Sequence, residues 1–389
     1  MKVAIYVPHG AVPDKRGFAP AIVAWNLARR LKAAKPIIIS AREDYSITHE
    51  NVDGVPVYRI GEGRLYRRLF RKATRLDPYP LHRRAAKIAR RETPDLFHAH
   101  QLEFPVADFL RSLGRRLPVV VHTHAVRAFD PALGLADRYI AVSEYTRGLL
   151  VGRGYPADRI EVIYNGVDTS TFMPPRAEEK QQLRRTYDIA PDARVVSFVG
   201  RKQTSKGFHS FLKVADELLR RHEDVFVLSA GPALYQRDAE RASITHLLAR
   251  LAGNPRFRDF PALQHDKLSS LYKISDIVLL PTQHGGEQHP LVVVEAMASG
   301  CLTMATAMAG IKETIRHGAT GYLIKDGSNL EELVELTDAV VKDLVAQKGI
   351  REAAREYAVS TFDWNIITQK LERLYGDLAG GGTRAYEKN

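Results

Sequence analysis

The stretch HGGEQHPLVVVEAMASG, which runs from His284 to Gly300, decides the fold expected for this chain. It follows an apolar run, Ile277–Leu280, that predicts a buried strand. Two adjacent glycines predict a loop after that strand, and Pro290 is typical of the first turn of a helix. A strand, a glycine loop and a helix start in this order predict an anion-binding site.

The helix start explains why an anion would bind. The first N–H groups of a helix, here those of Pro290's neighbours Leu291 and Val292, lack partners within the helix and carry partial positive charge. Glu287 lies in the loop, beside whatever is attached to a bound phosphate. Glu295 lies about 7.5 Å further along the helix axis, at roughly 1.5 Å per residue. A carboxylate there could accept hydrogen bonds from the ribose of a nucleotide.

Glu287 and Glu295, separated by seven residues and followed by Ala-Met-Ala-Ser-Gly, resemble the signature of glycosyltransferase family 4. Further segments that match in order are Ala141–Glu144, Val162–Asp168, Gly200–Gly207 and Ser275–Pro281. The resemblance implies a GT-B fold, in which two Rossmann-like α/β domains face a central cleft. It also implies a retaining enzyme that uses a nucleotide-sugar donor, with a UDP- or GDP-sugar expected and no other cofactor.

Length and composition are those of an ordinary soluble globular protein. A chain of 389 residues, 45% hydrophobic and 26% charged, predicts two globular domains. The single cysteine, Cys301, excludes an intramolecular disulfide and indicates a reducing compartment. No signal peptide or membrane span is evident, so a cytoplasmic location is expected. The net charge of +12 indicates anionic partners, such as a nucleotide, a phospholipid surface or a nucleic acid.

The expected domains are 1–174 for the acceptor and 175–363 for the nucleotide sugar. Pro174-Pro175 and the charged run Arg176–Arg185 predict the linker between them. By resemblance, a helix over 364–379 crosses back to the first domain. The glycine-rich tail 380–389 is expected to be flexible.

In the first domain, Gly17 lies between a predicted strand, Val3–Val7, and a predicted helix, Ala19–Lys32. A glycine at this place lets a backbone approach a ligand closely. The family usually has adjacent glycines there, whereas this chain has Arg16-Gly17-Phe18. Gly17 is therefore either a donor contact or an ordinary turn glycine.

Two later predicted strands, Asp95–His98 and Val119–His122, end in the histidine pairs His98/His100 and His122/His124, at the sheet edge where open α/β sheets bind ligands. Four histidines are compatible with zinc, but no carboxylate or thiolate has a suitable spacing, so we expect no metal. The resemblance implies that His124 contacts the donor sugar. His122 is the alternative, and a purely structural role for His124 remains open.

The segment Gly61–Thr93 is strongly basic, with arginines and lysines around the apolar residues Leu65, Leu69, Phe70 and Ala73. This pattern is typical of an interfacial helix. The segment is interpreted as a solvated helix packed on the sheet, as a docking site for an anionic membrane or a lipid-linked acceptor, or as a nucleic-acid surface.

In the second domain, the loop Gly200–Gly207 carries Arg201 and Lys206, which can bind diphosphate oxygens. By resemblance, the turn at Gly231 lies near the nucleotide and Leu263 contacts the base.

The chemistry expected is metal-independent transfer of a hexose to a cell-envelope glycan or a lipid-linked acceptor. No Asp-x-Asp triplet is present to hold a metal, so Arg201, Lys206 and the helix start would stabilise the leaving diphosphate. The resemblance implies front-face attack, with Glu287 holding sugar hydroxyls. The alternatives are a GT-B glycan phosphorylase with pyridoxal phosphate, an inactive nucleotide-sugar binding protein, or a nucleic-acid binder; no nucleic-acid partner is expected.

Overall fold

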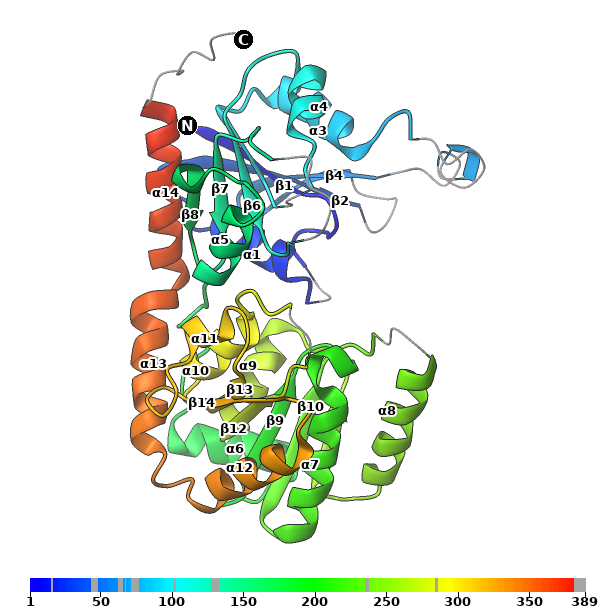
Figure 1. Cartoon of the computed structure of the whole chain (residues 1–389), viewed down its shortest axis with the longest axis vertical. Helices are drawn as coiled ribbons and strands as arrows, with labels where there is room; N and C mark the ends of the chain where they lie inside the picture. The colour runs from blue at the N-terminus through cyan, green and yellow to red at the C-terminus, as the bar shows by residue number, and fades with distance from the viewer. Residues whose placement is uncertain are drawn as a thin grey trace. The chain divides into compact units, whose positions relative to one another are not determined.

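Parallel strands alternating with helices form two compact units in the computed structural model of the chain (Figure 1). The first unit comprises Met1–Asn165 and Trp364–Asn389, and the second comprises Gly166–Asp363. The structure describes residues 1–14, 17–42, 48–61, 66, 68–70, 77–100, 103–126, 133–234, 238–283 and 286–380. The predicted α/β fold class is confirmed.

The first unit contains a sheet with the strand order β3-β4-β2-β1-β5-β6-β7-β8, parallel except for the β3–β4 pair. Its strands are β1 (Lys2–Val7), β2 (Lys35–Ala41), β3 (His49–Val52), β4 (Val55–Ile60), β5 (Leu96–Ala99), β6 (Val119–Thr123), β7 (Arg138–Ala141) and β8 (Ile160–Val162). Its helices are α1 (Ala19–Ala28), α3 (Leu81–Glu92), α4 (Val106–Leu113), α5 (Glu144–Val151), the 3₁₀ turn Ala157–Arg159 and α14 (Trp364–Gly380).

Strand alternation directs the side chains of β5 to opposite faces of this sheet. Phe97 packs against α3 and α4 in a buried aromatic and aliphatic cluster, with its ring centroid 4.1 Å from that of Phe109. The neighbouring His98 must therefore face the other side of the sheet. There its Nδ1 lies 2.6 Å from the hydroxyl of Tyr375 on α14. The last helix of the chain thus belongs to the first unit, as predicted.

The second unit contains a fully parallel sheet with the order β11-β10-β9-β12-β13-β14. Its strands are β9 (Arg194–Val199), β10 (Val225–Ala230), β11 (Phe257–Phe260), β12 (Ile277–Leu280), β13 (Leu302–Thr306) and β14 (Tyr322–Ile324). Its helices are α6 (Ala177–Thr186), the 3₁₀ turn Thr204–Lys206, α7 (Phe208–Arg221), α8 (Asp238–Leu251), α9 (His265–Ile274), α10 (Leu291–Ala298), α11 (Ile311–Thr314), α12 (Leu330–Lys342) and α13 (Lys348–Phe362). This is the 3-2-1-4-5-6 order of the dinucleotide-binding fold, with the reversal between β9 and β12.

The boundary between the units lies at 165/166, not at the predicted 174/175. Residues after Asn165 are hydrogen-bonded into the second unit: the Val167 N–H donates to the Phe362 carbonyl at 2.7 Å. Arg355 also donates to the Phe172 carbonyl, at 2.7 Å. These hydrogen bonds, one between backbones and one from an arginine side chain, assign the segment to the second unit.

The charged run Arg176–Arg185 was predicted to be a linker, which is wrong, because it contains helix α6. Arg184 on this helix is buried and donates to Asp276 at 2.7 Å, and Lys180 donates to the other oxygen of the same carboxylate at 2.6 Å. Burial alone would raise the pKa of Asp276, but the two cations lower it below its ordinary value. The charges therefore attach α6 to the sheet through a paired internal carboxylate.

Other predictions differ from the structure in smaller ways. Helix α1 ends at Ala28, four residues before the predicted end, and the antiparallel edge strand β3 was not predicted at all. The tail beyond residue 380 and most of the predicted interfacial helix, including Leu65 and Ala73, lie outside the described residues. In the part of the chain that the structure describes, no helix has both the length and the hydrophobicity to cross a bilayer.

Candidate donor site

The loops after β9, β10 and β12 meet at the topological switch point of the second unit. Gly207 has a φ of 76°, and a Cβ there would lie 1.8 Å from the Pro281 carbonyl oxygen at the end of β12. Gly231 has a φ of 148°, and a Cβ there would lie 1.8 Å from the Gly200 carbonyl oxygen. Only glycine permits these approaches. The two glycines hold three loops together where open α/β sheets bind ligands.

This packing brings together Lys206 and Glu287, which are 81 residues apart in the sequence. The Lys206 Nζ donates to Glu287 Oε1 at 2.5 Å, and both side chains are mostly buried. The Gln283 N–H also donates to the Ser205 carbonyl at 3.2 Å, linking the two loops through their backbones. The predicted phosphate-binding cation and the predicted sugar-binding acid therefore form one ion pair.

Helix α10 follows Glu287 and begins at Leu291, with Pro290 as its N-cap. The helix start predicted at Pro290 is therefore one residue early. Pro290 provides no side-chain cap, so the first N–H groups, those of Leu291 and Val292, are not capped from that position. The adjoining His284 and Gly285 lie outside the described residues.

Glu295 lies in the middle of α10 and is buried. Burial raises its pKa from 4.5 to about 7, although a hydrogen bond from the Tyr272 hydroxyl, at 3.1 Å to Oε2, acts in the opposite direction. Tyr272 lies on α9 and is itself fully buried. The structure thus gives the predicted ribose-binding acid an aromatic partner that sequence spacing did not indicate.

The other predicted residues of this unit occupy the surrounding loops. Arg201 is exposed directly after Gly200, and Leu263 is half-buried in the loop after β11. Lys202, beside Arg201, is buried instead: its Nζ lies 2.6 Å from both the Phe260 carbonyl oxygen and a carboxylate oxygen of Asp259. Of the two adjacent cations, one is structural and the other is available to a ligand.

The first unit holds Gly17 and His124. Gly17 has a φ of 78°, and its N–H donates to Asp14 at 2.5 Å, as does that of Phe18 at 2.9 Å. Asp14, which sequence reasoning missed, therefore organises the turn before α1. His124 is half-buried, and its Nε2 lies 3.0 Å from Nδ1 of His100. Desolvation lowers the pKa of His124 to about 3.

Family models match both units. The model described as Glycosyltransferase Family 4 matches residues 21–171, and that described as glycosyl transferases group 1 matches residues 179–357. Together the two matches cover most of the chain.

Named relatives are glycosyltransferases. The lipopolysaccharide 1,2-N-acetylglucosaminetransferase of Salmonella typhimurium strain LT2 is 25% identical over 370 residues, covering 94% of this chain and 95% of that protein. The D-inositol 3-phosphate glycosyltransferase of Mycolicibacterium gilvum is 34% identical over 243 residues, which cover 62% of this chain and 52% of the relative. The chain thus spans about half the length of that second relative.

Solved structures share the fold. Anabaena Alr3699/HepE in complex with UDP-glucose superimposes with a TM-score of 0.78 at 20% identity, covering 97% of this chain and 100% of that one. Sucrose-phosphate synthase from Thermosynechococcus elongatus gives a TM-score of 0.82 at 19% identity, covering 98% of this chain and 100% of that one. At these identities the likeness shows the fold alone.

Proposed function

This chain belongs to the family 4 glycosyltransferases of the GT-B fold, and from that premise we propose that it transfers a hexose from a nucleotide-diphosphate sugar with retention of configuration. The observation that carries the proposal is the Lys206–Glu287 pair at the switch point of the second unit. It places a cation for a diphosphate beside an acid for sugar hydroxyls, next to a helix start.

The donor site is proposed to be formed by the loops of the second unit. The diphosphate would bind Arg201, Lys206 and the N–H groups of Leu291 and Val292, which carry positive charge or partial positive charge. Glu295 would accept the ribose hydroxyls. Donor diphosphate would then replace Glu287 as the main partner of Lys206, and the released carboxylate would bind the hexose.

Two further contacts of the donor are proposed. Gly231 adjoins Gly200 and therefore Arg201, so its backbone would border the nucleotide. Leu263, in the loop after the edge strand β11, would contact the base. The complex of Alr3699/HepE with UDP-glucose supports a uridine nucleotide, with a GDP-sugar as the second choice.

We propose that the transfer needs no divalent metal at the diphosphate. Arg201, Lys206 and the start of α10 would stabilise the negative charge of the leaving group by fixed dipoles and charges. His124 is proposed, from the resemblance, to contact the donor sugar. Its neutral imidazole, held by His100, could exchange a hydrogen bond with a sugar hydroxyl without adding a charge. Gly17, in the turn organised by Asp14, is proposed as a backbone contact to the donor.

Calorimetry of nucleotide binding tests this site. We expect UDP to bind the wild-type chain with equal affinity in EDTA and in Mg²⁺, and more tightly than GDP or ADP. The Arg201→Ala/Lys206→Ala variant should bind at least about 100-fold more weakly, because each charge-assisted contact contributes about 1.5–3 kcal/mol.

The matched control removes two exposed lysines of the same unit, Lys325→Ala/Lys348→Ala, and should leave the affinity unchanged. Equal affinities for all three proteins would contradict the assignment of the diphosphate site. A panel of UDP-, GDP- and ADP-sugars in thermal-shift assays then identifies the donor.

The acceptor is proposed to be a glycan or lipid-linked molecule of the cell envelope, presented at an anionic membrane surface. The Salmonella relative, named for lipopolysaccharide, supports the class of acceptor. Within Gly61–Thr93, helix α3 buries Ala85 and Ala89. It exposes a row of basic side chains at Arg83, Lys87 and Arg90.

This row follows helical spacing, since residues three and four apart share a face. In the same basic segment, the exposed Leu69 and Phe70 provide apolar side chains that could enter a lipid interface. A basic helix face and exposed apolar groups in one segment fit an anionic bilayer better than a neutral one.

Vesicle sedimentation tests the proposed membrane surface. Wild-type protein should sediment with phosphatidylglycerol-containing vesicles and remain in solution with pure phosphatidylcholine. Replacing Arg83, Lys87 and Arg90 by glutamine should reduce binding by about 100-fold, at about 1 kcal/mol per charge near the surface. The control with Arg241, Lys325 and Lys348 replaced by glutamine carries the same charge change; equal losses in both variants would contradict a specific surface.

A further inference from the structure

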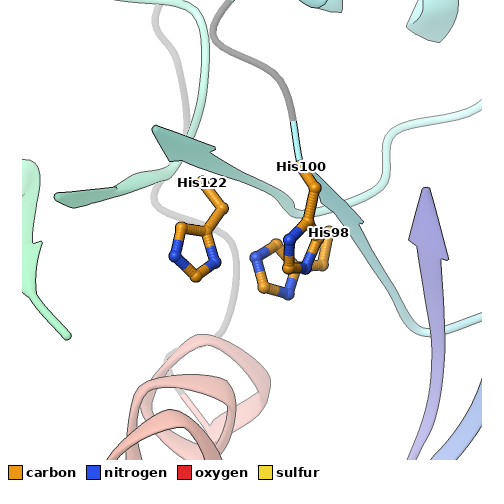
Figure 2. A group of neighbouring side chains, drawn as sticks. All are labelled: His98, His100 and His122. Atoms are coloured by element: carbon orange, nitrogen blue, oxygen red, sulfur yellow. The ribbon is translucent and has the colours of Figure 1, made fainter. Parts of the chain in front are cut away.

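Three histidines at the ends of β5 and β6, His98, His100 and His122, form a cluster, and none of the three is itself a proposed donor contact. One ring nitrogen of each of His98, His100 and His122 lies within 4.8 Å of the other two, and all three residues are buried (Figure 2). From this geometry we propose that His98, His100 and His122 bind a divalent transition metal, with Zn²⁺ as the expected ion.

The cluster contains ring nitrogens without a hydrogen-bond partner, which supports a role in binding a metal ion. Among the described residues, no hydrogen-bond partner is found for Nε2 of His98, Nε2 of His100, or either ring nitrogen of His122. A buried polar atom without a hydrogen-bond partner costs free energy, because it has lost its bonds to water without replacement. A metal ion would use three of these nitrogens and remove most of that cost.

The paired nitrogens support the same conclusion. His98 uses Nδ1 toward the Tyr375 hydroxyl, at 2.6 Å, and His100 uses Nδ1 toward Nε2 of His124, at 3.0 Å. Histidines that bind a metal typically hold the ring in place through the nitrogen that does not coordinate. In both residues this arrangement leaves Nε2 for the metal. Tyr375 and His124 would therefore orient the ligands without touching the ion.

The ionisation state of the cluster is suitable for metal binding. Burial, reinforced by the neighbouring imidazoles, lowers the pKa of His98, His100 and His122 well below the ordinary value. The rings are therefore neutral at pH 7, and neutral imidazole is the form that coordinates a metal. A proton does not compete with the ion at this pH.

The donor set selects the kind of metal. Three imidazoles without a carboxylate suit zinc, copper or nickel, whereas Mg²⁺ and Ca²⁺ require oxygen ligands. Zinc with three protein ligands leaves its fourth position to water or another small ligand. The His98 and His122 rings are stacked, with centroids 5.3 Å apart. Tetrahedral ligand atoms lie about 3.4 Å apart at zinc–nitrogen distances near 2.1 Å, so side-chain rotations would close the set around the ion.

This site is independent of the proposed metal-free handling of the diphosphate, because its ligands belong to the first unit, whereas Arg201 and Lys206 belong to the second. From the sequence we expected no metal, because no carboxylate or thiolate stands at a suitable spacing. The folded chain supplies three imidazoles from two neighbouring strands instead.

Metal titration of the full, untagged chain tests the proposal without using activity. After treatment with a chelator, wild-type protein should take up one equivalent of Zn²⁺, measured by elemental analysis and by competition with a chromophoric chelator. Zinc should also raise the Tm, since a ligand that binds only the folded state stabilises it. Co²⁺ in place of Zn²⁺ should give visible absorption bands of a coordinated ion.

Three variants decide the outcome. His122→Asn should lose the bound equivalent and the zinc-dependent rise in Tm, whereas His246→Asn, which replaces an exposed histidine of the second unit, should behave as wild type. Tyr375→Phe keeps the buried ring and should weaken zinc binding by about 10–100-fold. This milder variant tests the site even if His122→Asn fails to fold. Zinc uptake by His122→Asn equal to that of wild type, or none by wild type, would overturn the proposal.

Discussion

Glu287→Gln should lower kcat by about 10²–10³-fold while changing KM for the donor much less. This is the loss typically seen when one preorganised polar contact to the reacting group is removed. The physical reason is that Glu287, paired with Lys206 at 2.5 Å, is released only when a diphosphate takes over the lysine. Its carboxylate would then accept hydrogen bonds from the sugar hydroxyls, and its negative charge would stabilise the positive charge that develops on the anomeric carbon and ring oxygen as the glycosidic bond breaks.

Steady-state kinetics with a nucleotide sugar and an acceptor, followed by UDP titration, measure this prediction. The control is Glu356→Gln, which removes an exposed carboxylate from α13 of the same unit and should leave kcat unchanged. UDP should bind Glu287→Gln at least as tightly as wild type, because Lys206 is no longer paired. A fall in UDP affinity with an unchanged kcat would contradict the proposed role.

Glu295→Gln should make the free protein more stable at pH 8 and the nucleotide complex weaker. Folding favours protonated Glu295, because its pKa in the folded chain is about 7 rather than 4.5. The stability that this residue contributes is therefore complete below about pH 4.5 and is lost as the pH rises through 7. The difference amounts to about 3 kcal/mol.

Glutamine resembles the protonated acid and should retain this stability at high pH. We expect a Tm about 6–12 °C above that of wild type at pH 8, for a unit of this size, and little difference near pH 4.5. Calorimetric scans at the two pH values measure it. Equal pH dependence of the two proteins would show that Glu295 does not ionise between these values.

Nucleotide affinity should change in the opposite direction. Ribose hydroxyls donate to the ionised acid, so UDP affinity of wild type should rise with pH through about 7, and that of Glu295→Gln should not. At pH 8 the variant should bind about 10–100-fold more weakly, since hydrogen bonds to a charged group contribute about 1.5–3 kcal/mol. Tyr272→Phe provides the matched control: it keeps the acid and removes its hydrogen bond, so the rise in affinity should move to higher pH.

Local sequence patterns predicted the strand and the helix start beside the donor site. Strand β12, Ile277–Leu280, has the predicted bounds, because a short apolar run between turn signals identifies a buried strand. Helix α10 begins one residue after the predicted start. The edge strand β3 was missed because its side chains are only partly buried, so it lacks the apolar alternation of a core strand.

The sequence by itself determined the family and the α/β fold, and it supplied the acids and cations proposed for the donor site, because those signals are carried by residues close together in the sequence. Only the tertiary structure decided how distant residues pair. The Lys206–Glu287 contact, the burial of Glu295 beside Tyr272, the attachment of α6 through Asp276 and the three-histidine cluster all join separate strands or helices. Such contacts depend on strand order and loop packing, and sequence spacing does not encode these distances.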